Sequence, residues 1–120
     1  MISKTTGLVK LTVLLALINI IFVVTALGQV DQGRITGTIK DTTGAVIPGV
    51  SVNITNEKTG EERATLTTDR GDYLVVGLKP STYTVRAALD GFAPTEAKSL
   101  QLLVGQTLAI DLTVKPEIGR

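Results

Sequence analysis

The stretch Tyr83-Thr84-Val85-Arg86-Ala87-Ala88-Leu89 alternates apolar and polar side chains along its whole length. A β-strand points successive side chains to opposite faces, so Tyr83, Val85, Ala87 and Leu89 would share one face. This period of two is typical of a strand with one buried face, whereas a helix repeats its apolar residues every three or four positions. The stretch therefore predicts a strand that covers a core with one face and exposes the other.

Six further short apolar runs lie before and after this stretch, and Gly, Pro, Asp or Asn residues separate them. The apolar residues that mark the seven predicted strands are Ile35, Gly37 and Ile39; Val50, Val52 and Ile54; Ala64 and Leu66; the run Tyr73-Leu74-Val75-Val76; Tyr83, Val85, Ala87 and Leu89; Leu100 and Leu102; and Leu108, Ile110, Leu112 and Val114. Each sheet built from such strands has an apolar face that a second sheet must cover. The sequence predicts an all-β fold, a seven-stranded antiparallel β-sandwich of prealbumin-like or Ig-like Greek-key type.

The N-terminal segment has a different composition from the rest. It carries Lys4 and Lys10, no acidic residue, and then an apolar run from Leu11 to Val24. Small residues follow at Ala26 and Gly28, as in the cleavage sites of secretory signal peptides. We expect a helical signal peptide at residues 1–28, cleaved between Gly28 and Gln29. The sandwich domain would then occupy residues 29–115, followed by a tail at 116–120.

The alternative for this segment is an uncleaved membrane anchor. The apolar run from Leu11 to Leu27 has the length of a short bilayer-spanning helix. Contact with a membrane is expected only through this segment, and only if it is retained. Either way the chain is predicted to be exported, to the periplasm or the outer membrane or beyond it.

Composition excludes several functional classes. The whole chain has 12 Lys and Arg against 11 Asp and Glu, and the leader holds two of the basic residues. Without a clustered basic surface, binding to nucleic acid is not expected. The chain has no His and no Cys, which rules out Ser-His-Asp and Cys-His catalysis and His-ligated zinc. We therefore expect neither enzymatic activity nor a cofactor or metal.

Several turn residues allow a second interpretation. Asp41, Asp69 and Asp72 are oxygen donors of the kind that calcium prefers, but no EF-hand pattern is present and capping of their own turns is the favoured role. Arg70-Gly71-Asp72 matches a short adhesion motif, yet a Gly is also what a tight turn between two strands requires.

Aromatic residues bear on carbohydrate binding, because sugar sites use exposed aromatic platforms. Tyr73 and Tyr83 are in phase with apolar neighbours, which favours a place in the core. Phe92 follows Asp90-Gly91 at a predicted loop, so it is the candidate ligand contact.

A resemblance to a known family extends over about Gly33 to Val114. The segments that carry it are Gly37-Thr38-Ile39-Lys40-Asp41, Gly44, Pro48-Gly49-Val50-Ser51-Val52, Thr68-Asp69, Gly71-Asp72-Tyr73, Leu78, Tyr83-Thr84-Val85 and Gly91-Phe92. In this order and spacing they resemble the carboxypeptidase regulatory-like domain family, with Ser81 where members often carry Gly. The resemblance implies a transthyretin-like or starch-binding-like sandwich. It also implies an accessory role, as in the similar domains that follow the signal peptide of TonB-dependent outer-membrane receptors.

Three functions follow as expectations. The first is a docking module that uses sheet edges or loops to bind a protein partner or an outer-membrane receptor. The second is a carbohydrate-binding module of starch-binding-like fold. The third is that the chain is the truncated N-terminal piece of a TonB-dependent receptor.

Overall fold

The structure is a computed structural model, and it describes residues 7–17 and 32–117. The chain divides into two compact units, Met1–Val30 and Asp31–Arg120. In the first unit, residues 7–17 form a helix, in which the Thr12 hydroxyl donates to the Leu8 carbonyl at 2.7 Å. Among the described residues, no helix has the length and apolar character needed to cross a bilayer. The predicted cleavage site at Gly28 and Gln29 lies outside the described residues.

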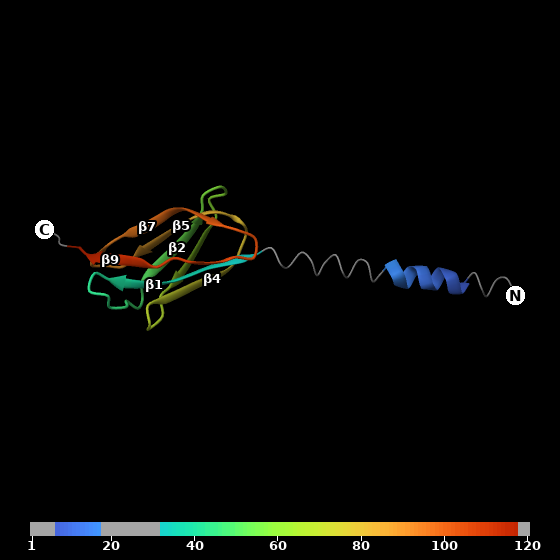
Figure 1. Cartoon of the computed structure of the whole chain (residues 1–120), viewed down its shortest axis with the longest axis horizontal. Coiled ribbons are helices and arrows are strands. Elements are labelled where there is room, and N and C mark those ends of the chain that lie inside the picture. The colour runs from blue at the N-terminus through green and yellow to red at the C-terminus, as the bar shows by residue number, and fades with distance from the viewer. Residues whose placement is uncertain (1–6, 18–31, 118–120) are drawn as a thin grey trace. The chain divides into compact units, whose positions relative to one another are not determined.

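The described residues of the second unit form nine strands joined by loops (Figure 1). They are β1 (Gly33–Asp41), β2 (Ser51–Asn56), β3 (Glu62–Leu66), β4 (Asp72–Leu78), β5 (Ser81–Ala88), β6 (Phe92–Ala93), β7 (Thr95–Leu102), β8 (Thr107–Ala109) and β9 (Leu112–Pro116). The predicted count of seven is wrong for two reasons. The short β6 was not expected, and the last predicted strand is divided into β8 and β9.

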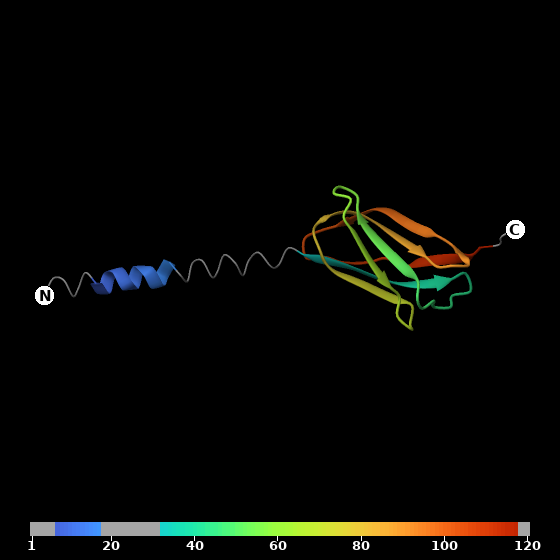
Figure 2. The ribbon, with the colours of Figure 1, turned by 180° about the vertical axis from the view of Figure 1, so that it is seen from behind.

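The strands form two layers, which confirms the predicted sandwich. One sheet has the order β4-β1-β9-β6 with β8 also beside β1, and the other has the order β3-β2-β5-β7. Figure 2 shows the layers from behind, with green β2 and orange β7 in one and teal β1 and red β9 in the other. Most neighbours are antiparallel, but β8 and β9 both run parallel to β1.

The core lies between the two sheets and contains the predicted inward residues of β1, β2 and β5. The prediction for the third strand is wrong: Ala64 and Leu66 are exposed, because in β3 they lie opposite Asn53 and Ser51 on the outer face of the sheet. In β1 the burial alternates residue by residue, and Ile35 and Ile39 are fully buried. The predicted residues of β2 and β5 are buried in the same way. Fully or nearly fully buried hydrophobic residues are Ile35, Ile39, Ile47, Val50, Val52, Ile54, Tyr73, Val75, Leu78, Tyr83, Val85, Ala87, Leu102 and Val114.

The division between β8 and β9 has a cause in β1. Gly37 has no side chain, so the Ile110 main chain comes so close that a β-carbon at Gly37 would lie 1.8 Å from the Ile110 carbonyl oxygen. The next residue, Asp111, accepts the Thr38 N–H on its carboxylate at 2.8 Å. The Thr38 N–H is therefore bonded to the Asp111 side chain and not to a main-chain carbonyl. This interrupts the hydrogen-bond ladder that β1 forms with β8 and β9.

Candidate functional site

An open depression of about 550 Å³ lies where β2 begins, β5 ends and β6 follows. Its lining combines main chain, small residues and a few apolar side chains. The lining residues are Gly49, Ser51, Ala88, Leu89, Asp90, Gly91, Phe92, Pro94 and Glu117. We call it the Phe92 depression.

Phe92 is placed there by a tight turn. Its N–H donates to the Leu89 carbonyl at 3.0 Å, and Gly91 adopts a φ of 87° that favours glycine. The ring is half-buried and packs against the core with one part of its surface. The predicted ligand contact therefore lines a depression, with only part of its ring available.

Main-chain hydrogen bonds fix the walls of the depression. The Glu117 N–H donates to the Gly91 carbonyl at 2.8 Å, and β6 pairs Phe92 with Pro116. On the other side, the Gly49 N–H donates to the Thr67 carbonyl at 3.1 Å. A ligand would meet preformed walls, which lowers the ordering cost of binding.

The depression has a negative rim. Asp90 and Glu117 are both exposed, and neither Lys nor Arg is among the described residues that line it. Lys115 lies close by, opposite Ala93 in the β6–β9 pair. No local sequence pattern pointed to Glu117, because it lies in the predicted tail and reaches the depression only through strand pairing.

A second cavity is much smaller, about 40 Å³, and is lined by Asn56, Glu61, Arg63, Gly77, Leu78, Lys79 and Tyr83. This space holds no more than a few water molecules. It carries no ligand site.

The two tyrosines lie in the core, as their phase indicated. Tyr73 is 2% exposed and its hydroxyl donates to the Ile110 carbonyl at 2.5 Å. The Tyr83 hydroxyl donates to the Lys79 carbonyl at 2.6 Å, four residues upstream. Burial raises the pKa of both phenols, and the nearby carboxylates of Asp111 and Glu61 respectively raise it further. Neither ring is available for stacking on a sugar.

The Asp41 carboxylate caps its own turn, and the Asp72 carboxylate accepts the Thr38 hydroxyl of the neighbouring β1 at 2.7 Å. One oxygen of Asp41 accepts the Thr43 N–H at 2.8 Å, the Thr43 hydroxyl at 2.6 Å and the Ala45 N–H at 3.1 Å. These bonds, above all the one from the Thr43 hydroxyl, hold the pKa of Asp41 below its ordinary value. Among the described residues, His, Cys, Asp and Glu form no group of three that could hold a metal ion.

Gly71, in the Arg70-Gly71-Asp72 motif, has a turn function. Its φ is 77°, its N–H donates to the Thr68 carbonyl, and its carbonyl accepts the Ile39 N–H at 2.8 Å. A β-carbon there would lie 2.9 Å from the Ile39 carbonyl oxygen. The turn against β1 thus requires this glycine.

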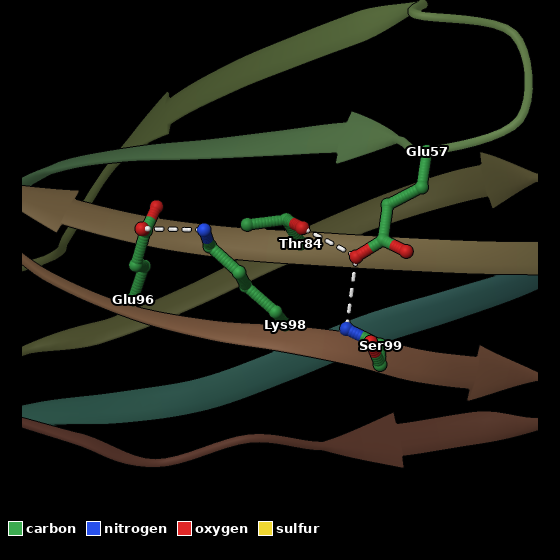
Figure 3. A network of polar contacts seen from close by, with 5 residues as sticks. All are labelled: Glu57, Thr84, Glu96, Lys98 and Ser99. Carbon is green, nitrogen blue, oxygen red and sulfur yellow. Dashed lines mark hydrogen bonds and ion pairs between the residues drawn. The ribbon is translucent and has the colours of Figure 1, made fainter.

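Glu57 directly follows β2 and links β5 and β7 on the outer face of the β3-β2-β5-β7 sheet. Figure 3 shows its carboxylate beside Thr84 of β5 and the main chain of Ser99 in β7. One oxygen accepts the Thr84 hydroxyl at 2.6 Å and the Ser99 N–H at 2.8 Å. The Thr84 bond, followed by the Ser99 bond, lowers the pKa of Glu57, and Lys98 contributes by its charge.

The Glu57 contact supports an irregular stretch of β7. The register of β5 and β7 shifts between Tyr83 and Val85, so Thr84 faces two residues of β7, and Ser99 has a φ of 59°. That φ is unfavourable for a residue with a side chain. Lys98 in the same bulge forms an ion pair with Glu96 at 3.4 Å. Glu57 and Ser99 are 42 residues apart, so no local pattern could predict this network.

The family of this sandwich follows from its sequence. A model of the carboxypeptidase regulatory-like domain matches residues 34–115. The chain belongs to this family. A comparison of the chain with curated protein sequences found no match.

Solved structures share the sandwich of this carboxypeptidase regulatory-like domain. A "putative carbohydrate binding protein" from Bacteroides uniformis is 26% identical with a TM-score of 0.57, covering 70% of this chain and 41% of that one. The pilus 2b backbone protein of group B streptococcus is 17% identical with a TM-score of 0.54, covering 72% and 42%. A catechol 1,2-dioxygenase of Acinetobacter radioresistens is 14% identical with a TM-score of 0.55, covering 75% and 53%.

These likenesses differ in what they support. At 17% and 14% identity, the pilus protein and the dioxygenase show a shared fold alone. The regulatory-like domain spans about half or less of the length of the three proteins. Each of the three proteins is longer than this domain, so its activity belongs to the longer chain.

Proposed function

We propose that this carboxypeptidase regulatory-like domain is an exported, non-catalytic docking module that binds a segment of a protein partner in the Phe92 depression. The observation that carries the proposal is the combination of fixed walls, a half-buried Phe92 and a rim with Asp90 and Glu117 but no cation. An apolar residue next to a Lys or Arg in the partner would complement this surface. The absence of His and Cys from the sequence supports a non-catalytic role.

The partner chemistry can be tested with the full chain and an array of short extended peptides that carry Lys, Gln or Glu beside a Leu. We expect the Lys peptides to bind about two- to fivefold more tightly than the Gln peptides for each rim charge they meet. The double variant Asp90→Asn with Glu117→Gln should lose this preference. The control Asp69→Asn removes one negative charge from the loop before β4 and should keep it.

Equal binding of Lys, Gln and Glu peptides would contradict the proposal. Loss of the preference in the Asp69→Asn control would also contradict it, because the effect would then arise from net charge and not from the depression.

A second candidate is carbohydrate binding in the same depression. It is favoured by the exposed part of the Phe92 ring and by the likeness to the Bacteroides uniformis protein. Affinity gel electrophoresis on a panel of polysaccharides tests it. Retention that is lost in Phe92→Leu, which keeps apolar packing but removes the ring, would replace the protein-docking proposal.

For the location, we propose the periplasm or the outer membrane, with a TonB-dependent receptor as the partner or as the larger protein that contains this domain. The apolar run after Lys4 and Lys10 supports export. Fractionation of expressing cells, with mass spectrometry of the N-terminus, tests both export and cleavage at Gln29. Recovery of the chain in the cytoplasm with residue 1 retained would contradict this location.

A further inference from the structure

Among the strands that the structure describes, β4 has the edge that lacks protection. The strands of the two described sheets that pair on one side only are β4, β6, β8, β3 and β7. Natural sheets protect such edges with charges, bulges, prolines or very short strands, because unpaired main-chain groups otherwise recruit another strand.

Four of these edges carry such protection. β8 has only three residues. β6 has two residues and Pro94 follows it. β7 has the bulge at Ser99 with Glu96 and Lys98 around it. β3 holds a charge in an inward position, because Arg63 faces the buried Ile54 across the pair with β2.

β4 differs along most of its length. From Tyr73 to Leu78 it contains no charged residue and no proline. Its bulge comes only near its end, where the register with β1 shifts between Gly33 and Ile35 and Gly77 has a φ of 71°. The stretch up to Val76 is therefore a regular edge.

The unpaired main-chain groups of this edge belong to residues with exposed apolar side chains. The Ile39 N–H donates to the Gly71 carbonyl, and the antiparallel ladder then turns the main-chain groups of Tyr73 and Val75 toward β1. Those of Leu74 and Val76 point away from β1. The two side chains are 51% and 52% exposed.

At the N-terminal end of β4, hydrogen bonds between Asp72 and Thr68 limit this free edge. The Asp72 carbonyl accepts the Thr68 N–H at 2.9 Å, and the Asp72 N–H donates to the Thr68 hydroxyl at 3.3 Å. The edge thus offers two residues, Leu74 and Val76, with four main-chain groups between them.

We propose that the domain forms a symmetric dimer in which β4 pairs antiparallel with β4 of a second copy, about a twofold axis at Val75. In this register Leu74 of one copy lies opposite Val76 of the other, so all four free groups find partners. The same pairing places Leu74 beside Val76 on one face, where apolar cross-strand pairs are stabilising.

Charge supports a second copy as the occupant. The two Asp72 residues would lie at opposite ends of the ladder, about 20 Å apart for a six-residue offset, so no like charges face each other. The formal net charge of the chain is +1, so long-range repulsion between copies is weak. The dimer uses a surface different from the Phe92 depression and does not depend on the proposed function.

Cysteine pairing tests the register, since the chain has no natural Cys. Two differently tagged full chains, Leu74→Cys and Val76→Cys, are expressed together and treated with a mild oxidant. Opposed residues in such a pair lie about 5.5 Å apart, within the range for a disulfide. The control pair is Ala64→Cys with Leu66→Cys on β3, where the main-chain groups also point away from the neighbouring strand, since the Asn56–Glu61 and Thr67–Val50 bonds fix that phase.

We expect the β4 pair to give on the order of tenfold more mixed disulfide than the β3 pair, because only the β4 pair has the required geometry. In sedimentation experiments on the full chain in non-ionic detergent, Leu74→Lys should weaken dimerisation at least tenfold and Leu66→Lys should not. Equal cross-linking of the two pairs, cross-linking to a different protein, or a monomeric wild-type chain would overturn the proposal.

Discussion

At the scale of single residues, Thr67 shows how the wall of the Phe92 depression is held. This threonine is 6% exposed and follows the end of β3. Its hydroxyl accepts the Val50 N–H at 2.8 Å and donates to the Ile47 carbonyl at 2.8 Å. One side chain therefore satisfies both a donor and an acceptor of the loop that leads into β2.

Replacement of Thr67 by Val, which has the same shape, should remove both hydrogen bonds. A buried group left without a partner costs about 1–3 kcal/mol, so we expect the free energy of unfolding to fall by at least that amount in chemical denaturation. Thr67→Ser keeps the hydroxyl and should lose about 1 kcal/mol, the contribution of a buried methyl group. If the two variants are equally stable, the hydroxyl does not have this role.

At the scale of elements, the interruption between β8 and β9 depends on Gly37. Gly37→Ala would place a β-carbon 1.8 Å from the Ile110 carbonyl oxygen and 2.8 Å from the Tyr73 ring. Both neighbours are held in place, since the Tyr73 hydroxyl bonds that same carbonyl. We expect a loss of more than about 3 kcal/mol, as for severe overpacking, measured by thermal or chemical unfolding.

The matched control is Gly44→Ala in the loop after β1. A β-carbon at Gly44 meets nothing within 4 Å, but its φ of 89° is unfavourable for alanine. The expected loss is about 1–2 kcal/mol. A loss at Gly37 no larger than that at Gly44 would show that the close approach of Ile110 is not structurally important.

The Glu57 link between β5 and β7 should depend on pH. Its pKa is lower in the folded chain, mainly through the Thr84 hydroxyl and then the Ser99 N–H. Its stabilising effect is therefore complete above the ordinary glutamate pKa of about 4.3 and is lost as the pH falls through the lower folded value. An NMR titration should show the Ser99 amide shifting in that acidic range.

Two variants check this link. Thr84→Val should raise the pKa of Glu57 toward its ordinary value, and Glu57→Gln should abolish the acid-dependent shift at Ser99. If the Ser99 amide still titrates in Glu57→Gln, another carboxylate is responsible.

The alternation of the sequence predicted the elements well where each strand has one buried face. Ile35 and Ile39 in β1, and Val85 and Ala87 in β5, are buried as expected. The run Leu108, Ile110, Leu112 and Val114 alternates without a break, so it predicted one strand. The interruption depends on Gly37 and on the Asp111–Thr38 bond, which join residues far apart in the chain and leave no local pattern.

The candidate site was less predictable for the same reason. Phe92 was identified from the turn before it, but Gly49 and Glu117 reach the depression only because the start of β2, the short β6 and the end of β9 lie close together. Hydrogen bonds such as the one from the Ser99 N–H to the Glu57 carboxylate also form only in the folded sheet. Local periodicity predicts faces, and tertiary pairing decides which residues meet.

At the scale of the whole molecule, the sandwich has its own core. The unit Asp31–Arg120 is compact by itself, and all buried hydrophobic residues described lie within it. A fragment of residues 32–120 should therefore fold and give a far-ultraviolet circular dichroism spectrum typical of β-sheet. A spectrum dominated by helix, or a non-cooperative thermal transition, would contradict an independent core.

The parallel pairing of β1 with β8 and β9 has a mechanical consequence. Because β1 and β9 run in the same direction, β1 begins at one end of the sandwich and β9 ends at the other. Tension between segments attached to these two ends would load the inter-strand bonds in shear, so that many must break together and not one after another. We therefore expect the domain to resist stretching between these two ends.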